Sequence, residues 1–152
     1  MKLNKQDRQI LQRLQTNCRQ PIAEIGEQIG ISTSACHRRI KQLEEAGLIE
    51  SYVAQLNARQ LGYAMHILVE ISLSSQADSV LMRFEKAVQE APEILECHLM
   101  AGDADYILRI AATNLEDFER LHREVISHLP GVAKVRSNIA LRSVKAWSGY
   151  NV

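Results

Sequence analysis

The sequence predicts an α+β chain in which an N-terminal winged helix-turn-helix unit is followed by a ferredoxin-like βαββαβ domain. Three observations predict this fold. Apolar residues recur at helical spacing in three short segments before residue 46, and a glycine-containing turn separates the second segment from the third. After residue 63 the apolar period changes to 2 in four segments, with two helical segments between them. We therefore predict domains at 1–56 and 64–152, joined by a linker at 57–63.

The first two helices have clear starting signals. Asn4 is a good N-cap, and Asp7 stands at the position that completes a capping box. Pro21 begins the second helix, because proline fits the first turn of a helix. The apolar positions on the inner sides of these helices are Ile10, Leu11, Leu14, Ile22, Ile25 and Ile29. Together with the helix that follows, they are expected to bury a small shared core.

The third helix is the most informative segment. Ser32 is a good N-cap, Gly47 is a good stop, and Cys36, Ile40 and Leu43 form one apolar stripe. On the other sides, Arg can donate two hydrogen bonds to guanine, Gln can pair with adenine, and Ser or Lys can hold phosphates. The candidate DNA-binding residues are Ser32, Thr33, Ser34, His37, Arg38, Arg39, Lys41 and Gln42. A solvated amphipathic helix is the alternative for this segment alone, but the preceding helix and short turn favour a helix-turn-helix.

Two finer expectations accompany this helix. Arg39 lies nearer the apolar stripe than Arg38, so we expect it to touch phosphate or to pair with Glu44. Residues 49–56 alternate enough to be a strand, which would form the wing. Gly26 lies inside the second helix, where glycine costs roughly 1 kcal/mol relative to alanine.

The second half is expected to fold as strand, helix, strand, strand, helix, strand. Alternation marks the strands at 65–73, 95–99, 106–110 and 135–141, and helical spacing marks helices at 78–90 and 114–129. Both helices carry a single apolar stripe and should cover the same face of the sheet. The opposite face is expected to hold His66, Leu68, Glu70, His98, Met100, Ile107 and Arg109. This mixture is too apolar for water alone, so we expect a homodimer or a higher homo-oligomer.

Bulk properties narrow the function classes. The 152 residues have a net charge of zero, but residues 1–62 carry nine Lys/Arg against six Asp/Glu, which fits DNA binding at one end of the chain. Three widely spaced cysteines lack zinc spacing and suggest buried or semi-buried free thiols, so no metal or cofactor is expected. No catalytic set appears, and the chain is not expected to be an enzyme. The absence of a signal or membrane-spanning run predicts a cytoplasmic protein without a membrane partner.

Several segments together resemble a known family. These are residues 7–11, 24–32, 36–44 and 47–49 in the first half, and Glu96 to Leu108 in the second. They are similar to the Lrp/AsnC (feast/famine, leucine-responsive) transcription regulators along essentially the whole chain. The resemblance implies a regulator that binds double-stranded DNA. It also implies a second half that is a regulation-of-amino-acid-metabolism (RAM) domain, with dimers that assemble into tetramers or octamers.

Departures from the family pattern are local. Proline is common in the turn before the family's recognition helix, where this chain has Thr33 and Ala35. A basic N-terminal extension is almost absent, and the C-terminal tail is short.

The resemblance also implies an effector site. In relatives a glycine-containing turn lines an amino-acid site between subunits, and here that turn spans Met100, Ala101, Gly102, Asp103, Asp105 and Tyr106. Asp103 or Asp105 could take the ammonium of an amino acid, and turn N–H groups its carboxylate. A plain hairpin turn is the alternative. For the whole chain, the alternative is a ferredoxin-like, small-molecule-binding regulatory subunit that does not bind DNA. Salt-dependent binding to duplex DNA separates the two.

Overall fold

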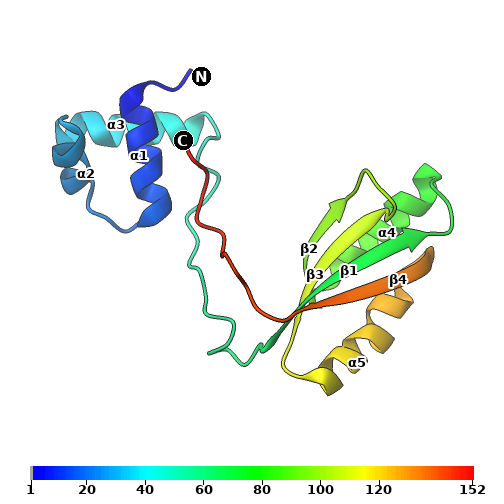
Figure 1. The fold of residues 1–152 in the computed structure, drawn as a ribbon. Helices are drawn as coiled ribbons and strands as arrows, with labels where there is room; N and C mark the ends of the chain where they lie inside the picture. The colour runs from blue at the N-terminus through cyan, green and yellow to red at the C-terminus, as the bar shows by residue number, and fades with distance from the viewer. Residues whose placement is uncertain (1) are drawn as a thin grey trace. The chain divides into compact units, whose positions relative to one another are not determined.

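Residues 2–152 are described by a computed structural model in which the chain divides into two units (Figure 1). The helical unit contains the chain up to Gln55 together with the last eight residues, Lys145–Val152, which we call the tail. The sheet unit contains Leu56–Val144. We predicted residues 145–152 to lie with the sheet, and the structure instead places them with the helices.

Three helices form the helical unit: α1 (Lys5–Thr16), α2 (Ile22–Ile29) and α3 (Thr33–Glu45). The capping box of α1 is present, because the Asn4 N–H donates to Asp7 Oδ2 at 3.1 Å and the Asp7 N–H donates to Asn4 Oδ1 at 2.9 Å. The expected apolar stripes meet in one core that contains Ile10, Leu11, Ile25, Cys36, Ile40 and Leu43. The predicted helix-turn-helix is therefore confirmed.

Glycines shape the turn between α2 and α3. Gly30 ends α2 in the left-handed region with a φ of 74°, where a side chain would be strained. A Cβ on Gly26 would lie 2.9 Å from the carbonyl oxygen of Ile31 and 3.6 Å from the Cβ of Cys36. Glycine at position 26 makes α2 less stable than alanine would, but it lets the turn and α3 approach α2 closely.

The expected wing strand at residues 49–56 is wrong. Residues 50–57 have no regular secondary structure, and the side chains of Val53 and Leu56 are 78% and 69% exposed. A strand needs a neighbour to pair its N–H and C=O groups, and alternation of side chains supplies none. Within the described part of the chain, no other segment pairs with these residues.

The sheet unit has the predicted ferredoxin-like order. Its elements are β1 (Met65–Leu73), α4 (Asp78–Glu90), β2 (Ile94–Leu99), β3 (Tyr106–Ala112), α5 (Leu115–Glu124), a 3-10 turn (Ile126–His128) and β4 (Val132–Ala140). The strands pair antiparallel in the order β2-β3-β1-β4. Phe84 and Val88 of α4 and Leu121 of α5 pack on the same sheet face, together with the buried residues of β1 and β3. The second helix is shorter than expected, because it tightens into the 3-10 turn.

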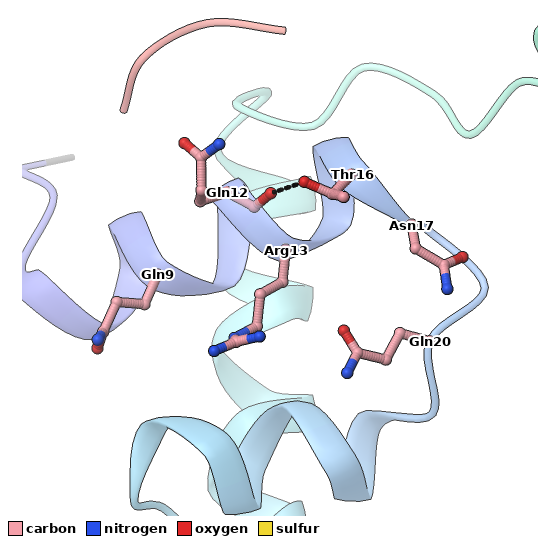
Figure 2. A pocket seen from close by; sticks show the side chains of 6 residues that line it. All are labelled: Gln9, Gln12, Arg13, Thr16, Asn17 and Gln20. Atoms are coloured by element: carbon pink, nitrogen blue, oxygen red, sulfur yellow. Dashed lines mark hydrogen bonds between the residues drawn. The ribbon is translucent and has the colours of Figure 1, made fainter. Parts of the chain in front are cut away.

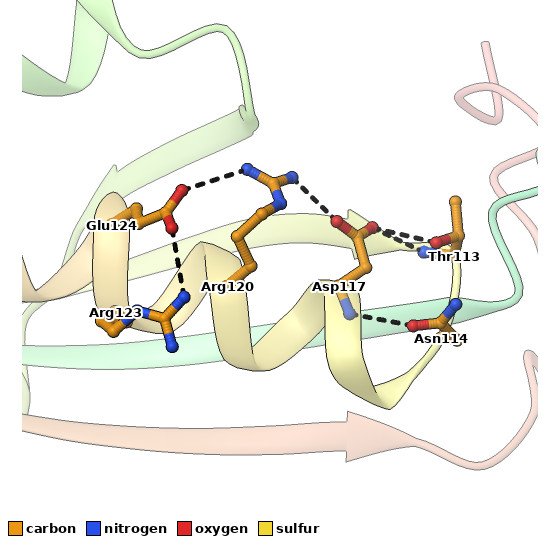
Figure 3. A network of polar contacts seen from close by, with 6 residues as sticks. All are labelled: Thr113, Asn114, Asp117, Arg120, Arg123 and Glu124. Carbon is orange, nitrogen blue, oxygen red and sulfur yellow. Dashed lines mark hydrogen bonds and ion pairs between the residues drawn. The ribbon is translucent and has the colours of Figure 1, made fainter.

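Helix α5 begins in a polar network (Figure 3). The side chain of Asn114 caps the helix by accepting from the Asp117 N–H at 2.9 Å. The Asp117 carboxylate accepts from the N–H of Thr113 at 2.9 Å and from the guanidinium of Arg120 at 2.8 Å. These bonds lower the pKa of Asp117, with the backbone hydrogen bond from Thr113 as the largest cause.

The sheet face opposite the helices, which we call the open face, is partly exposed. Leu68 on β1 is 45% exposed, and its register partner on β3 is Arg109. Arg109 pairs with Glu96 on β2 at 2.6 Å. Glu70 of β1 pairs with Arg136 of β4, the other neighbour of β1, at 3.4 Å. The Nε of Arg109 is buried without a hydrogen-bond partner in the described residues.

Candidate DNA-binding helix and candidate effector turn

Helix α3 has a buried apolar side and an exposed polar side. Cys36 and Leu43 are fully buried and Ile40 is 7% exposed. Ser32 caps the helix by accepting from the Ala35 N–H at 3.2 Å, and its hydroxyl lies 3.2 Å from that of Ser34. Seven of the eight candidate DNA-binding residues are exposed: Ser32, Thr33, Ser34, His37, Arg38, Lys41 and Gln42. Their side chains are therefore free to meet another molecule.

Arg39 behaves differently from its neighbours. Its guanidinium lies 2.9 Å from the carboxylate of Asp7, and the side chains are 26% and 3% exposed. The expected pairing with Glu44 is wrong, because Glu44 instead accepts a hydrogen bond from the hydroxyl of Tyr52 at 2.8 Å. Burial, followed by this hydrogen bond, raises the pKa of Tyr52 to about 12. Arg39 therefore joins α3 to α1 within the protein.

The part of α3 before Leu43 carries basic side chains and no acidic one. No acidic residue occurs between Ser32 and Leu43. Lys41 lies 3.7 Å from Glu45, but both side chains are about two-thirds exposed, at 68% and 65%. Such a surface pair contributes about 0–1 kcal/mol, so Lys41 can leave it for a phosphate at little cost. The chemistry of this surface suits a polyanion that also offers hydrogen-bond acceptors.

A groove of about 310 Å3 runs along α1 and into the loop that follows it (Figure 2). Its lining side chains are polar: Gln9, Gln12, Arg13, Thr16, Asn17 and Gln20. Among the described residues that line the groove, Arg13 is the only charged one and none carries a carboxylate. The groove therefore lacks the acid that would neutralise the ammonium of an amino acid.

The candidate effector turn lies between β2 and β3. The Met100 N–H donates to the carbonyl of Asp105 at 2.8 Å, which closes the turn. Both carboxylate oxygens of Asp105 already have partners: one accepts from the Leu73 N–H at 2.7 Å, and the other from the side-chain amide of Gln76 at 2.5 Å. Asp105 therefore fastens the turn to the end of β1, and its expected role as an ammonium ligand conflicts with these bonds.

The burial and contacts of Tyr106 also conflict with its expected role in effector binding. It is 1% exposed, its hydroxyl donates to Glu85 at 2.7 Å, and its ring centroid lies 4.6 Å from that of Phe84. Burial, followed by the hydrogen bond to Glu85, raises its pKa. The ring faces the helices because β3 alternates, and the turn fixes which residues of the strand point inward.

The other turn residues are accessible. Met100, Ala101, Gly102 and Asp103 are exposed. Gly102 has no atom within 4 Å of the position of a Cβ, and its φ is outside the left-handed region. The fold of this chain therefore does not itself require glycine at 102.

Other features bear on metals, thiols and membranes. Among residues 2–152, no cluster of three or more His, Cys, Asp or Glu side chains could hold a metal ion. Cys36 is buried and Cys97 is half-buried, whereas Cys18 is exposed, contrary to expectation. Within the described chain, no helix is both long and apolar enough to cross a bilayer.

Sequence reasoning missed three structural partners of the candidate DNA-binding helix. The Asp7–Arg39 pair joins residues 32 positions apart, which local patterns do not reveal. The close approach at Gly26 could have been predicted, because a glycine inside a helix often marks a position where another segment packs closely. The third is the tail, whose Val152 packs against the helical core. The apolar and aromatic residues of the tail are the sequence feature that could have indicated this packing.

Comparison with known proteins gives two family matches. Residues 66–149 match the family described as Lrp/AsnC ligand binding domain. Residues 3–50 match the family described as winged helix-turn-helix DNA-binding. The two matches meet between residues 50 and 66, where the structure passes from helices to sheet, and the second match also includes residues 145–149 of the tail.

Individual proteins are similar along most of their length. The leucine-responsive regulatory protein of Escherichia coli K12 is 36% identical over 143 residues, covering 94% of this chain and 87% of the relative. An uncharacterized HTH-type transcriptional regulator of Sinorhizobium fredii is 44% identical over 119 residues, covering 78% and 94%.

Two solved structures have similar folds and more than a quarter of the sequence in common. A transcriptional regulator from Neisseria meningitidis, solved as an L-Met complex, is 31% identical with a TM-score of 0.90, covering 95% of this chain and 94% of that one. An AsnC family transcriptional regulator from Agrobacterium tumefaciens is 30% identical with a TM-score of 0.91, covering 97% and 96%.

Proposed function

The chain belongs to the Lrp/AsnC family of transcription regulators, and on that premise we propose how this regulator contacts DNA and what controls it. The observation that carries the proposal is the exposed, acid-free surface formed by residues 32–43, beside a turn shaped by Gly26 and Gly30. A helix held in this way can enter the major groove. The protein acts in the cytoplasm, where its DNA is.

The residues of α3 divide the contact between bases and backbone. Arg38 and Gln42 read base edges, because guanidinium and amide groups can make paired hydrogen bonds to guanine and adenine. His37 lies beside them. Ser32, Thr33 and Ser34 at the start of the helix, with Lys41, hold phosphates. Arg39 contributes by fixing α3 on α1 through Asp7.

The regulator works as a homodimer or a higher oligomer built on the open face. Leu68 and the half-buried Ile107 supply apolar area, and the flanking ion pairs supply complementary charge. A two-fold axis would then present two α3 helices to successive major grooves, about 34 Å apart.

The effector is an amino acid held beside residues 100–103, between subunits. Asp103 is exposed, and its carboxylate has no hydrogen bond or ion pair among the described residues. It is therefore the acid that meets the ammonium. Gly102 leaves room for the ligand or a second subunit, a role that the fold of the single chain does not need. The L-Met complex of the relative from Neisseria meningitidis supports this choice of ligand class.

One experiment tests the DNA proposal directly. Duplexes selected by the protein from a random pool are titrated at several salt concentrations, with unselected duplexes of equal length as the control. We expect tighter binding to the selected duplexes and a steep loss of affinity as salt rises. Equal affinity for both pools, or binding without salt dependence, would contradict the proposal.

A further inference from the structure

The tail is fastened to α1 by a two-way amide contact. The side-chain amide nitrogen of Gln15 donates to the carbonyl of Tyr150 at 3.1 Å, and the Tyr150 N–H donates to Gln15 Oε1 at 2.6 Å. One glutamine thus satisfies both backbone groups of one residue, as a neighbouring strand would. Val152 adds an apolar contact to the core of the helical unit.

Gly149 is shaped for this contact. Its φ of 91° lies in the region that side chains rarely adopt, and a Cβ there would lie 2.5 Å from Gln15 Oε1. Next to it, the rings of Trp147 and Tyr150 pack edge to face with centroids 4.8 Å apart. The tail therefore has a defined conformation in the absence of regular secondary structure.

Because of the order of segments along the chain, the contact between the tail and α1 creates a second connection between the two units. Leu56–Val144, the whole sheet unit, is inserted between the three helices and the tail. The helical unit is therefore joined to the sheet unit by two chain crossings. A single connector leaves a unit free to rotate, whereas a second attachment restricts its accessible orientations and reduces the entropy lost when DNA binds.

We propose that the tail is a structural part of the DNA-binding unit and works as its second tether, with Gln15 and Gly149 as the residues that hold it. While the tail is docked, the orientations open to α3 are limited, and binding to two half-sites is favoured. Release of the tail removes the second connection and weakens binding without altering any side chain that faces DNA.

Docking is tested without DNA in the full-length protein. Trp147 is the only tryptophan of the chain, so its fluorescence anisotropy reports tail mobility. Cleavage after Lys145 by a lysine-specific protease reports access to the tail backbone. Gly149→Ala should lower the anisotropy and speed this cleavage several-fold. Gly62→Ala is the matched control, because Gly62 also has a φ of 91° but nothing within 4 Å of its Cβ position.

The tether is tested on the duplex with two half-sites that the parent protein selects. Gln15→Ala removes both hydrogen bonds to Tyr150. Gln12→Ala changes an exposed residue of the same helix that, among the described residues, has no hydrogen bond to the tail. Gln15→Ala should release the tail and weaken DNA binding several-fold, whereas Gln12→Ala should do neither. Unchanged anisotropy and cleavage in both Gly149→Ala and Gln15→Ala would overturn the docking. A released tail with parental DNA affinity would overturn the tether.

Discussion

The carboxylate of Asp7 and the guanidinium of Arg39 join the first turn of α1 to the middle of α3 at 2.9 Å. Asp7 also accepts the N–H of Asn4 and so closes the capping box. One buried acid therefore caps the start of the first helix and positions the helix that carries the proposed DNA-binding residues. The adjacent Arg38 is exposed, so the two neighbouring arginines have different surroundings.

Arg39→Met should lower the free energy of unfolding of the helical unit by about 2–4 kcal/mol, because Asp7 would be left buried without its cation. Arg38→Met is the matched control and should change stability by less than about 0.5 kcal/mol, as is usual for an exposed site. Urea unfolding followed by circular dichroism measures both. Equal stability of the two variants would contradict the structural role of Arg39.

Arg38→Ala should weaken binding to the selected duplex by about 1–3 kcal/mol and blur the preference for selected over random DNA, because a base contact is lost. Lys41→Ala should weaken binding to both duplexes alike and reduce the salt slope by about 1, because a phosphate contact is lost. Titrations at several salt concentrations distinguish the two. An equal loss on selected and random DNA in Arg38→Ala would count against base reading by this residue.

Leu68→Asp should break the oligomer, because it places a charge in the middle of the open face. Met82→Asp is the control, since Met82 is 68% exposed on the outer side of α4, away from that face. Sedimentation at micromolar concentration should give a monomer for Leu68→Asp only. A monomeric parent protein, or an intact oligomer in Leu68→Asp, would overturn the proposed interface.

Asp117→Ala should lower stability by about 1 kcal/mol at neutral pH, because the hydrogen bonds that its carboxylate accepts from Thr113 and Arg120 are lost. The pKa of Asp117 is lowered in the folded state, so its contribution is full above the unfolded pKa of about 3.9. It is lost as the pH falls through the folded pKa. The difference between parent and variant in acid unfolding should therefore shrink below about pH 4. Glu119→Ala, an exposed acid one turn from the cap, should have little effect on stability at neutral pH.

Sequence patterns predicted most of the fold because its elements follow local rules. The apolar stripe of α3 and the period-2 strands each bury one face, and the Asn4 and Ser32 caps satisfy the first N–H groups of their helices. The prediction of a wing strand at 49–56 was wrong because the alternation of side chains does not show whether another strand is available for pairing. The pairings of Arg39 and Asp105, and the docking of the tail, depend on contacts between distant residues. Those contacts decide which polar side chains remain free for DNA or ligand.

The last prediction distinguishes the roles of the two acids in the candidate effector turn, Asp103 and Asp105. Asp103→Asn should abolish the response of DNA binding to L-methionine or L-leucine while leaving the fold unchanged, because Asp103 is exposed. Asp105→Asn should instead lower stability by about 1–2 kcal/mol and keep the response, because its oxygens hold Leu73 and Gln76. Thermal unfolding with each amino acid, together with DNA titration, measures both effects, since a ligand that binds the folded state raises the midpoint. If the parent protein responds and Asp103→Asn responds equally well, the ammonium site lies elsewhere.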